Sequence, residues 1–203
     1  ICRCTGYRAI HDALKEFTKD GQLNSGAREM ADDSQCKTYI CPDPEHFPHD
    51  AEVKPVKIEY KGTQFFIPTD LSQLLYLKKK YPNGVLVAGA TELGIDIKVK
   101  KILSPVYISL HRVQELKHVD IVKGSELYIG ASTPLQDVLD FCRKPNQPLQ
   151  DQSSFFAQLE ERLQTFSSTQ IRNVACVVGN IACGSPVTDL SNFLIANNAI
   201  LNV

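Results

Sequence analysis

The amino-acid sequence predicts an α+β fold, in which strands and helices are joined by both hairpins and longer crossings. Two observations indicate strands: apolar and polar residues alternate over residues 55–68, and residues 85–88 form a short, continuous apolar run. A third observation indicates helices, because residues 155–166 place apolar side chains three and four positions apart. Mixed connections of this kind are typical of α+β domains.

The composition is that of an ordinary globular protein. The chain has 203 residues, enough for one full domain or for one domain and a smaller piece; 43% are hydrophobic and the net charge is −1. That charge gives no sign of nucleic-acid or membrane-surface binding, and no apolar run approaches the ~20 residues that span a bilayer. The 7 cysteines, odd in number and uneven in spacing, favour a reducing compartment over a secreted disulfide framework. We therefore expect a cytoplasmic protein with no nucleic-acid and no membrane partner.

Two cysteines one residue apart open the chain, in Ile1-Cys2-Arg-Cys4. Thiolates this close can both reach one metal around a turn that Gly6 permits, whereas a disulfide between them would be strained. Iron–sulfur and structural zinc centres usually take four protein ligands, so Cys2 and Cys4 would be half of a site. Spacing alone favours metal binding only modestly over a reactive or inert pair. A helical spacing follows over residues 7–17, and we interpret the sequence as an internal fragment of a longer protein.

Residues 21–54 are predicted to be a linker, because prolines, glycines and charged residues interrupt them. Cys36 and Cys41, followed by His46 and His49, loosely resemble a zinc site, but their spacing fits no compact finger. An exposed linker is the favoured interpretation. The expected organisation is therefore the end of a first domain at 1–20, the linker at 21–54 and a second domain at 55–203.

The second domain begins with a predicted hairpin around Lys61-Gly62. A helix follows at 71–81, capped by Thr69 or Asp70, and then the strand at 85–88, which we expect to be buried on both faces. This strand runs into the loop Gly89-Ala-Thr-Glu-Leu-Gly94, a common place for a phosphate or a ribose. The loop matches neither the P-loop nor the Rossmann pattern, so by itself it is equally consistent with a purely structural turn and with a ligand-binding loop.

Further elements are predicted over residues 106–166. They are a strand at 106–109, a helical turn at 113–116, a hairpin of 119–122 with 127–130, a helix from Thr133 as N-cap and Pro134 through Leu139, a loop at 144–152, and the amphipathic helix at 155–166. His111 and His118 are interpreted as surface or satisfied side chains rather than catalysts, because the sequence offers neither a partner.

The stretch 171–189 carries no charged side chain from position 174 to position 188, yet glycines, small hydroxyls and Asn180 interrupt its apolar residues. Glycines let a ligand approach the backbone, and successive N–H groups bind phosphate oxygens without a cationic side chain. Pro186 is expected to prevent a helix. The stretch is either a tightly packed core turn or a cradle for a nucleotide diphosphate, and we favour the cradle.

These motifs together resemble one family. Cys2-Arg-Cys4-Thr-Gly-Tyr-Arg-Ala-Ile10 closely resembles the second 2Fe-2S motif of the xanthine dehydrogenase and aldehyde oxidase family. The resemblance implies that Cys2 and Cys4 bind a 2Fe-2S cluster at the start of a helix in a small α-helical domain, with an upstream Cys-x-x-Cys supplying the other ligands. The stretches 86–94 and 171–189 look like the first and second flavin-binding loops of that family's FAD-binding domain, which is of the molybdopterin dehydrogenase (PCMH-like) type.

Position by position, the resemblance implies which residues contact FAD. Backbone N–H groups of Gly89, Ala90 and Thr91 would bind the diphosphate, and Asp189 would accept hydrogen bonds from cofactor hydroxyls. The implied set is Leu86, Val87, Ala88, Gly89, Ala90, Thr91, Glu92, Leu93, Phe166, Ser167, Ala175, Cys176, Gly179, Asn180 and Asp189. Ala90 stands where the family often has Asn or Gly, and Val178 where it commonly has Gly. Cys176 and Cys183 are interpreted as small lining residues, and no residue is predicted to be a general acid or base.

The resemblance also implies a function. The chain would be the electron-transfer portion of a molybdenum hydroxylase that oxidises a purine such as hypoxanthine or xanthine and passes electrons from the molybdenum cofactor, through 2Fe-2S clusters, to FAD and on to NAD+. One alternative is an aldehyde oxidase with dioxygen as acceptor; an alternative of another class is a non-catalytic nucleotide-binding scaffold. The family precedent is a homodimer, in the cytoplasm or alternatively the peroxisome.

Overall fold

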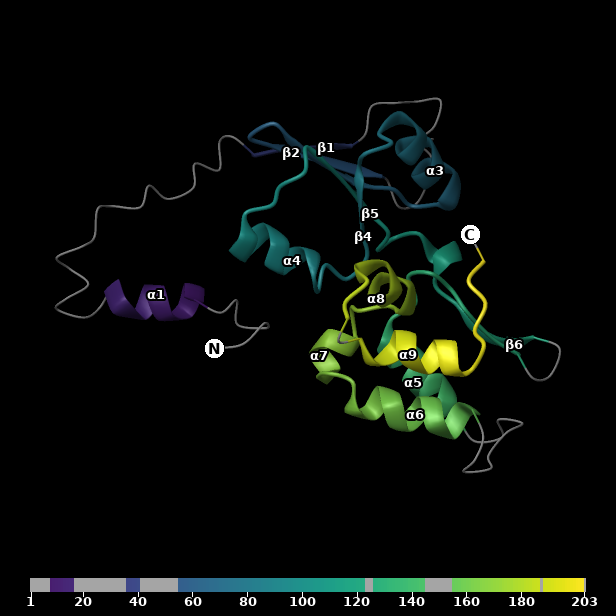
Figure 1. The fold of residues 1–203 in the computed structure, drawn as a ribbon. Helices are drawn as coiled ribbons and strands as arrows, with labels where there is room; N and C mark the ends of the chain where they lie inside the picture. Colours follow the sequence, from purple (N-terminus) through teal and green to yellow (C-terminus); the bar gives the residue numbers. More distant parts are fainter. Residues whose placement is uncertain are drawn as a thin grey trace. The chain divides into compact units, whose positions relative to one another are not determined.

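The computed structural model describes residues 8–16, 36–40, 55–122, 126–144, 155–186 and 188–202. The chain divides into two compact units, Ile1–Cys36 and Lys37–Val203. The first unit contains helix α1 (Arg8–Glu16), which confirms the helix predicted over residues 7–17 (Figure 1). Cys2, Cys4, Cys41, His46 and His49 lie outside the described residues, and the predicted domain boundaries stay predictions.

A five-stranded mixed sheet organises the first half of the second unit. Its strand order is β1-β2-β3-β5-β4, formed by β1 (Cys36–Ile40), β2 (Val56–Tyr60), β3 (Thr63–Ile67), β5 (Val106–Ser109) and β4 (Val85–Val87). Strands β2 and β3 pair antiparallel across the predicted hairpin, where Lys61 and Gly62 have φ of 47° and 80°. Both β3 and β4 pair parallel with β5.

Strand β1 was not expected, because it lies in the segment predicted as a linker. The segment Cys-Lys-Thr-Tyr-Ile contains three residues that favour strands, Thr, Tyr and Ile, and it adds to the edge of the sheet beside β2. A five-residue strand at an edge leaves little compositional signal between flanking charged and Pro-rich segments. The prediction that 21–54 is wholly loop is therefore wrong for Cys36–Ile40.

Helix α3 (Leu71–Lys80) packs beside β5 and begins at the predicted cap (Figure 1). The Asp70 carboxylate accepts a hydrogen bond of 2.9 Å from the backbone N–H of Gln73. Leu74 and Leu77 of α3 are buried with Phe66, Ile108 and Val113 in one hydrophobic cluster. This cluster fixes the sheet from which the loop after β4 emerges.

Strand β4 is an edge strand, and the expectation that it is buried on both faces is wrong because one of its faces is exposed at Leu86. Leu86 is 45% exposed, whereas Val87 is buried at 7%. The loop after β4 leads into α4 (Leu93–Ile95) and the π-helix η2 (Asp96–Lys100). This helical segment was not predicted, because its sequence has no helical spacing of apolar residues. An ion pair of 2.7 Å between Asp96 and Lys100 joins the two ends of η2.

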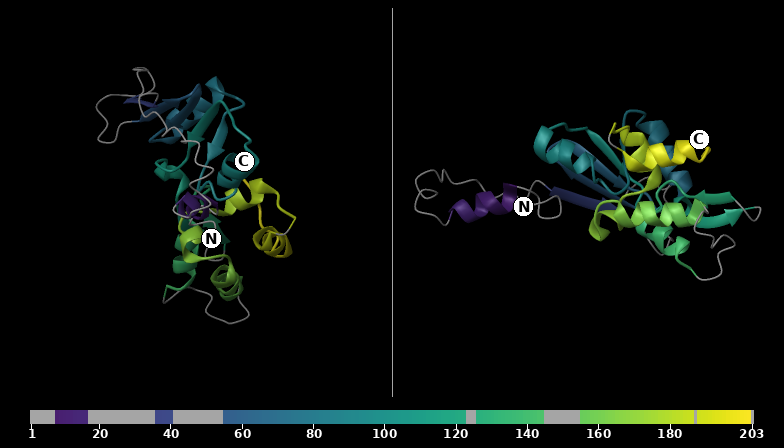
Figure 2. Two further views of the ribbon diagram at one scale, coloured as in Figure 1. Left: turned by 90° about the vertical axis from the view of Figure 1, so that its left-hand side faces the viewer. Right: turned by 60° about the horizontal axis from the view of Figure 1, so that its bottom comes forward.

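The second half of this unit has its own core. The 3₁₀ turn η3 (Gln114–Leu116) leads to the two-stranded sheet of β6 (Val119–Val122) and β7 (Glu126–Ile129). Helices α5 (Leu135–Cys142), α6 (Phe155–Thr165), α7 (Thr169–Arg172), α8 (Val177–Cys183) and α9 (Asp189–Ala196) follow. Figure 2 shows these helices from two further sides. Buried side chains of α5, α6, α8 and α9 form one cluster, and the stacked rings of Phe155 and Phe193, 5.5 Å apart, join α6 to α9.

Two details around α5 differ from the prediction. The helix starts at Leu135 with Pro134 at its N-cap, while Thr133 Oγ1 instead bonds the backbone N–H and carbonyl of His118, at 3.0 Å each. The Thr133 hydroxyl does not cap the helix, because it is bonded to these two backbone groups of His118. The His118 ring stacks on Tyr128 at 4.9 Å, and His111 is exposed, so each histidine has the structural or surface position expected of it.

The α+β class is confirmed by this arrangement of a mixed sheet, a hairpin and helices. Among the residues described, none of the helices combines the length and apolarity needed to traverse a bilayer.

Candidate cofactor site

The two predicted loops touch, although they lie far apart in the sequence. A Cβ placed on Gly89 would be 2.0 Å from the carbonyl oxygen of Val174, 2.4 Å from its carbonyl carbon and 3.0 Å from the amide nitrogen of Ala175. All of these are backbone atoms, which cannot rotate away as a side chain could. Glycine is therefore required at position 89 for the loop after β4 to lie against the segment that leads into α8.

The loop after β4 presents backbone N–H groups around a left-handed residue. Ala90 has φ of 52°, and its carbonyl accepts a hydrogen bond of 2.8 Å from Gly94. The N–H groups of Gly89, Ala90 and Thr91 donate to no other residue that the structure describes. Successive free N–H groups in a turn are a favourable environment for an anion such as a diphosphate.

The second loop is shorter than predicted, because most of its apolar residues form helix α8. The helix ends at Gly184, whose φ of 60° makes a left-handed C-cap, and Pro186 follows only after that stop. The prediction that Pro186 prevents a helix here is therefore wrong, since the helix ends before the proline. Val178 lies inside α8 with a negative φ, a position that β-branched residues can occupy.

Cys176 anchors the start of α8. Its Sγ accepts a hydrogen bond of 3.3 Å from the N–H of Gly179, so the thiol caps the helix where a hydroxyl more often does. The residue is 3% exposed, and burial raises the pKa of its thiol while the bond from Gly179 partly offsets the rise. A buried, protonated thiol fits the interpretation of Cys176 as a lining residue rather than a nucleophile.

Backbone bonds fix this cap in place. Leu135 donates 2.8 Å to the carbonyl of Ala175, and Pro134 and Cys176 form an antiparallel bridge. On the far side of α8, Thr188 Oγ1 donates to Asn180 Oδ1 at 2.5 Å and ties α8 to the start of α9. Asp189 is the first residue of α9, and its side chain lies outside what the structure describes.

Phe166 and Ser167 form a strained turn between α6 and α7. Ser167 has φ of 51°, which is uncommon for a residue with a side chain, and strain of this kind clusters at binding sites. Phe166 is half-buried against the helical core. The buried Arg172 holds this turn through the carbonyl of Phe166 at 3.0 Å. The sequence prediction did not single out Arg172. Its place directly before a stretch without charged side chains was the signal that could have indicated it.

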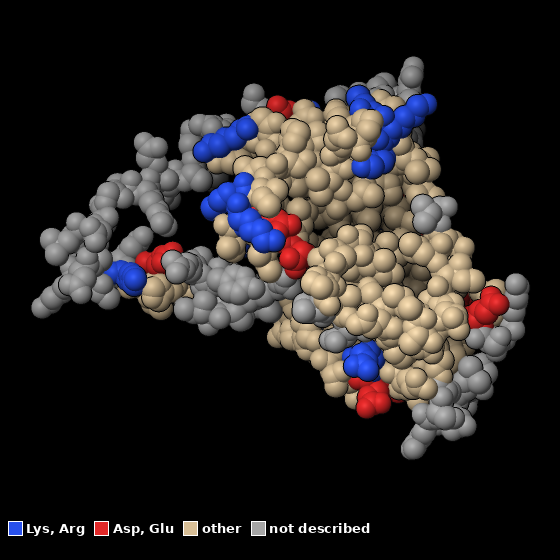
Figure 3. All heavy atoms as spheres, in the orientation of Figure 1, with Lys and Arg blue, Asp and Glu red and all other residues tan. Residues whose placement is uncertain are grey.

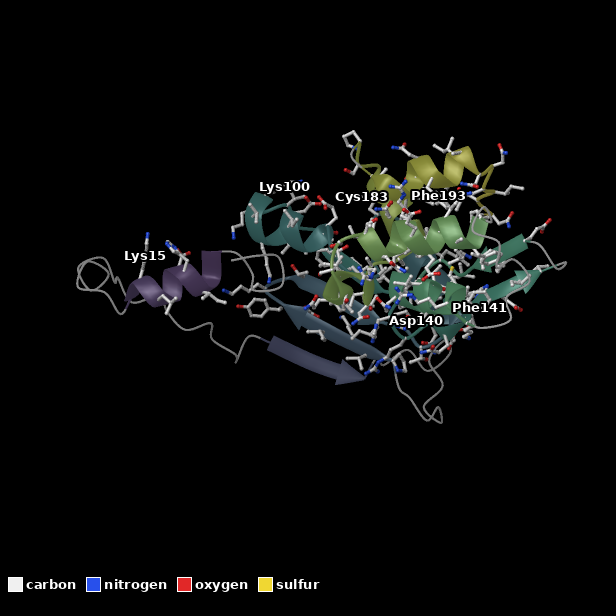
Figure 4. All side chains as sticks on the ribbon, turned by 90° about the horizontal axis from the view of Figure 1, so that it is seen from below. Lys15, Lys100, Asp140, Phe141, Cys183 and Phe193 are labelled. Carbon is white, nitrogen blue, oxygen red and sulfur yellow. The ribbon has the colours of Figure 1, made fainter. Side chains whose placement is uncertain are left out.

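A charged residue of the neighbouring helical segment lies near the end of α8. Lys100 of η2 and Cys183 of α8 lie on neighbouring elements, and the Asp96 carboxylate raises the pKa of Lys100 most strongly, with smaller contributions from Glu92 and Cys183 (Figure 4). Cys183 is exposed, as a lining residue can be. In Figure 3, the described side chains over α8 and α9 are largely uncharged.

The predicted residues therefore fall into three described groups. The loop after β4 and the cap of α8 meet at Gly89, Val174 and Ala175. The turn at Phe166 is bonded by Arg172, which precedes this junction in the chain. The first group is Leu86, Val87, Ala88, Gly89, Ala90, Thr91, Glu92 and Leu93; the second is Ala175, Cys176, Gly179 and Asn180; the third is Phe166 and Ser167. Free N–H donors, a close backbone junction and an uncharged surface fit a dinucleotide with an anionic diphosphate and neutral rings.

Comparisons with known proteins identify the family of the chain. Residues 59–203 match the family described as the FAD binding domain in molybdopterin dehydrogenase. The xanthine dehydrogenase of Calliphora vicina is 33% identical, with 97% of this chain and 17% of that protein covered. Aldehyde oxidase 1 of Bos taurus is 30% identical, with 100% of this chain and 18% of that protein covered. The chain thus spans about a sixth of the length of the curated relatives it matches.

Solved structures support the fold. The carbon monoxide dehydrogenase of Hydrogenophaga pseudoflava superposes with a TM-score of 0.52 at 24% identity, covering 62% of this chain and 41% of that chain. The quinoline 2-oxidoreductase of Pseudomonas putida superposes with a TM-score of 0.51 at 17% identity, covering 61% of this chain and 40% of that chain. At these identities the likeness concerns the fold alone.

Proposed function

The chain belongs to the family of FAD binding domains in molybdopterin dehydrogenases, and on that premise we propose that it binds FAD as the electron-transfer portion of an oxidoreductase. The backbone junction of Gly89 with Val174 carries the proposal, because it joins the two predicted flavin loops into one site. Bound FAD would supply the redox chemistry, while the chain supplies position and electrostatics.

Each part of the site has a role in holding the cofactor. The N–H groups of Gly89, Ala90 and Thr91 would donate to the diphosphate, and the cap of α8 at Cys176 would present further backbone N–H groups. Phe166 and Ser167 would contact the flavin from their strained turn. Asn180 is oriented by Thr188 to contribute an amide.

The test of FAD binding is a titration followed by flavin fluorescence. We expect FAD to bind at one site, and FMN, which lacks the adenosine and the second phosphate, to bind more weakly. If neither flavin binds, the proposal is overturned. If both bind equally, the diphosphate does not contribute to the affinity as proposed.

We further propose that the whole protein is a molybdenum hydroxylase resembling xanthine dehydrogenase. It would oxidise a purine such as hypoxanthine or xanthine at a molybdenum cofactor outside this chain, with 2Fe-2S clusters as carriers, Cys2 and Cys4 as ligands of one cluster, and NAD+ as acceptor. The relatives named xanthine dehydrogenase and the motif at residues 2–10 support it. Anaerobic bleaching of the flavin by xanthine, with recovery on adding NAD+, is the expected result in the full-length protein.

An aldehyde oxidase with dioxygen as acceptor is the second candidate, and a relative of that name at 30% identity favours it. Bleaching by an aldehyde but not by xanthine, with recovery only in air, would select this candidate. The suggestion of a non-catalytic scaffold rested on Val178 alone, which stands where the family commonly has Gly. Val178 lies in helix α8 with a negative φ, so its position does not require glycine, and this weakens the suggestion.

The cellular setting is proposed on the state of the cysteines. Of the cysteines in the described part of the chain, Cys142, Cys176 and Cys183 are free thiols, as in a protein kept in a reducing compartment, and we propose a cytoplasmic protein. By the precedent of the family, we propose that the full-length protein is a homodimer. Cell fractionation and light scattering of the full-length protein test the two parts of this proposal separately.

A further inference from the structure

Arg172, the last residue of α7, is a buried arginine that makes an extensive set of hydrogen bonds. It is 9% exposed, and its Nε donates to Gln136 Oε1 at 3.0 Å. Nη1 donates to the carbonyl oxygens of Phe166 at 3.0 Å and Gln164 at 3.5 Å, and Nη2 donates to Thr169 Oγ1 at 3.0 Å. No described carboxylate pairs with it. Burying a cation costs folding free energy, and neutral acceptors offset this cost only when they are all held within hydrogen-bonding distance of it.

The acceptors lie on both sides of the strained residue. Gln164 and Phe166 precede Ser167, and Thr169 follows it. An L-residue keeps a φ of 51° only where its surroundings hold the backbone there. The guanidinium therefore closes the turn across Ser167, and the carbonyls at the end of α6 favour a cation at that place.

The same guanidinium connects this turn to the rest of the site. Gln136 Nε2 donates to Asp140 at 2.9 Å, which orients the amide so that its oxygen faces Arg172. Gln136 follows Leu135 on α5, and Leu135 donates to Ala175 in the segment that meets Gly89. Two successive residues of α5 thus link the Phe166 turn to the junction of the two loops, Gln136 by its bond from Arg172 and Leu135 by its bond to Ala175.

We propose that Arg172 is a positioning residue for FAD: it holds Phe166 and Ser167 in the conformation that receives the flavin. The inference rests on the proposed function. Lysine cannot replace it, because an ammonium on a flexible stem cannot reach acceptors that a planar guanidinium contacts along separate edges. The expected consequence is that charge alone at position 172 does not maintain the site.

The test compares Arg172→Lys with Arg162→Lys, an exposed arginine of α6 that serves as matched control. FAD affinity is measured at a temperature where far-UV circular dichroism shows each variant folded. We expect Arg172→Lys to weaken FAD binding about tenfold or more, as loss of a charged hydrogen bond does, and to change the circular dichroism of the bound flavin. Arg162→Lys should change neither. A folded Arg172→Lys chain with the original affinity and flavin spectrum would overturn the proposal.

A second measurement separates positioning from general stability. Ser167→Gly removes the strain at φ 51°, so Arg172→Lys should cost less affinity in the Ser167→Gly background than in the original chain. An equal cost in both backgrounds would contradict the proposal. Hydrogen exchange of residues 166–169 without FAD gives a readout independent of binding: faster exchange in Arg172→Lys supports the proposal, and unchanged exchange opposes it. If the original chain binds no FAD, the proposed function and the positioning role for FAD both fall; if it binds FAD and exchange is unchanged in Arg172→Lys, only the role of Arg172 is overturned.

Discussion

Gly89→Ala tests the junction of the two loops most sharply. The added Cβ would lie 2.0 Å from the carbonyl oxygen of Val174 and 3.0 Å from the amide nitrogen of Ala175. A carbon and an oxygen in weak contact are about 3.3 Å apart, so the two backbones must separate by about 1.3 Å. No rotamer change can supply this separation, because the obstructing atoms belong to the backbone.

The expected loss follows from that displacement. Forcing an extra carbon into a packed contact costs about 1–3 kcal/mol of folding stability. A hydrogen bond of about 2.9 Å to the diphosphate, lengthened by more than 1 Å, is lost. Each lost bond to a charged group is worth about 1.5–3 kcal/mol, which corresponds to roughly a tenfold to hundredfold weaker FAD affinity.

The assay is a fluorescence titration of FAD against the original chain, Gly89→Ala and the control Gly94→Ala. A Cβ on Gly94 would meet nothing within 4 Å, and this residue lies in α4. Gly94→Ala should therefore keep the affinity and gain about 0.4–1 kcal/mol of stability. If Gly89→Ala folds and binds FAD as tightly as the original chain, the two loops do not form the site together.

Three further predictions concern single residues. Ala90→Gly should stabilise the chain by about 0.5–1 kcal/mol in urea unfolding, because φ of 52° costs alanine more than glycine; a loss of stability would contradict this. Cys176→Ala should cost about 1 kcal/mol through loss of the cap on Gly179, and Cys176→Ser should cost less; equal losses would show that the thiol does not act as a cap. Burial raises the pKa of Cys142 from 9.0 to about 11, so the unfolded chain loses this proton first, and stability should fall by about 2 kcal/mol from pH 9 to 11. That slope should be absent from Cys142→Ala in urea titrations at the two pH values.

The sequence was sufficient for elements with strong periodicity or distinct turn chemistry. The hairpin at Lys61-Gly62 needs left-handed residues, and α3 has its cap at Asp70, so both could be placed from local signals. Strand β1 and the segment of α4 and η2 were missed because they are short and owe their structure to neighbours. The prediction that β4 is buried on both faces was wrong, because a continuous apolar run does not distinguish an edge strand from a central one.

The site was predictable in its parts but not in its geometry. Both loops were recognised from their motifs, whereas the contact between Gly89 and Val174 depends on how the sheet and the helices pack. Helix α8 was missed because Pro186 and two glycines outweighed its apolar residues, although Gly179 is tolerated inside the helix and Gly184 ends it. Arg172 was missed because its role lies in acceptors of α5 and the α6–α7 turn that are distant in the sequence.

The most direct measurement is the visible absorption spectrum of the native full-length protein, together with chromatography of the small molecule that denaturation releases. FAD binding at the junction predicts released FAD, one molecule per chain, and the same experiment on Gly89→Ala should release much less. A colourless protein that also fails to take up added FAD would contradict the central claim and leave a binding scaffold as the interpretation.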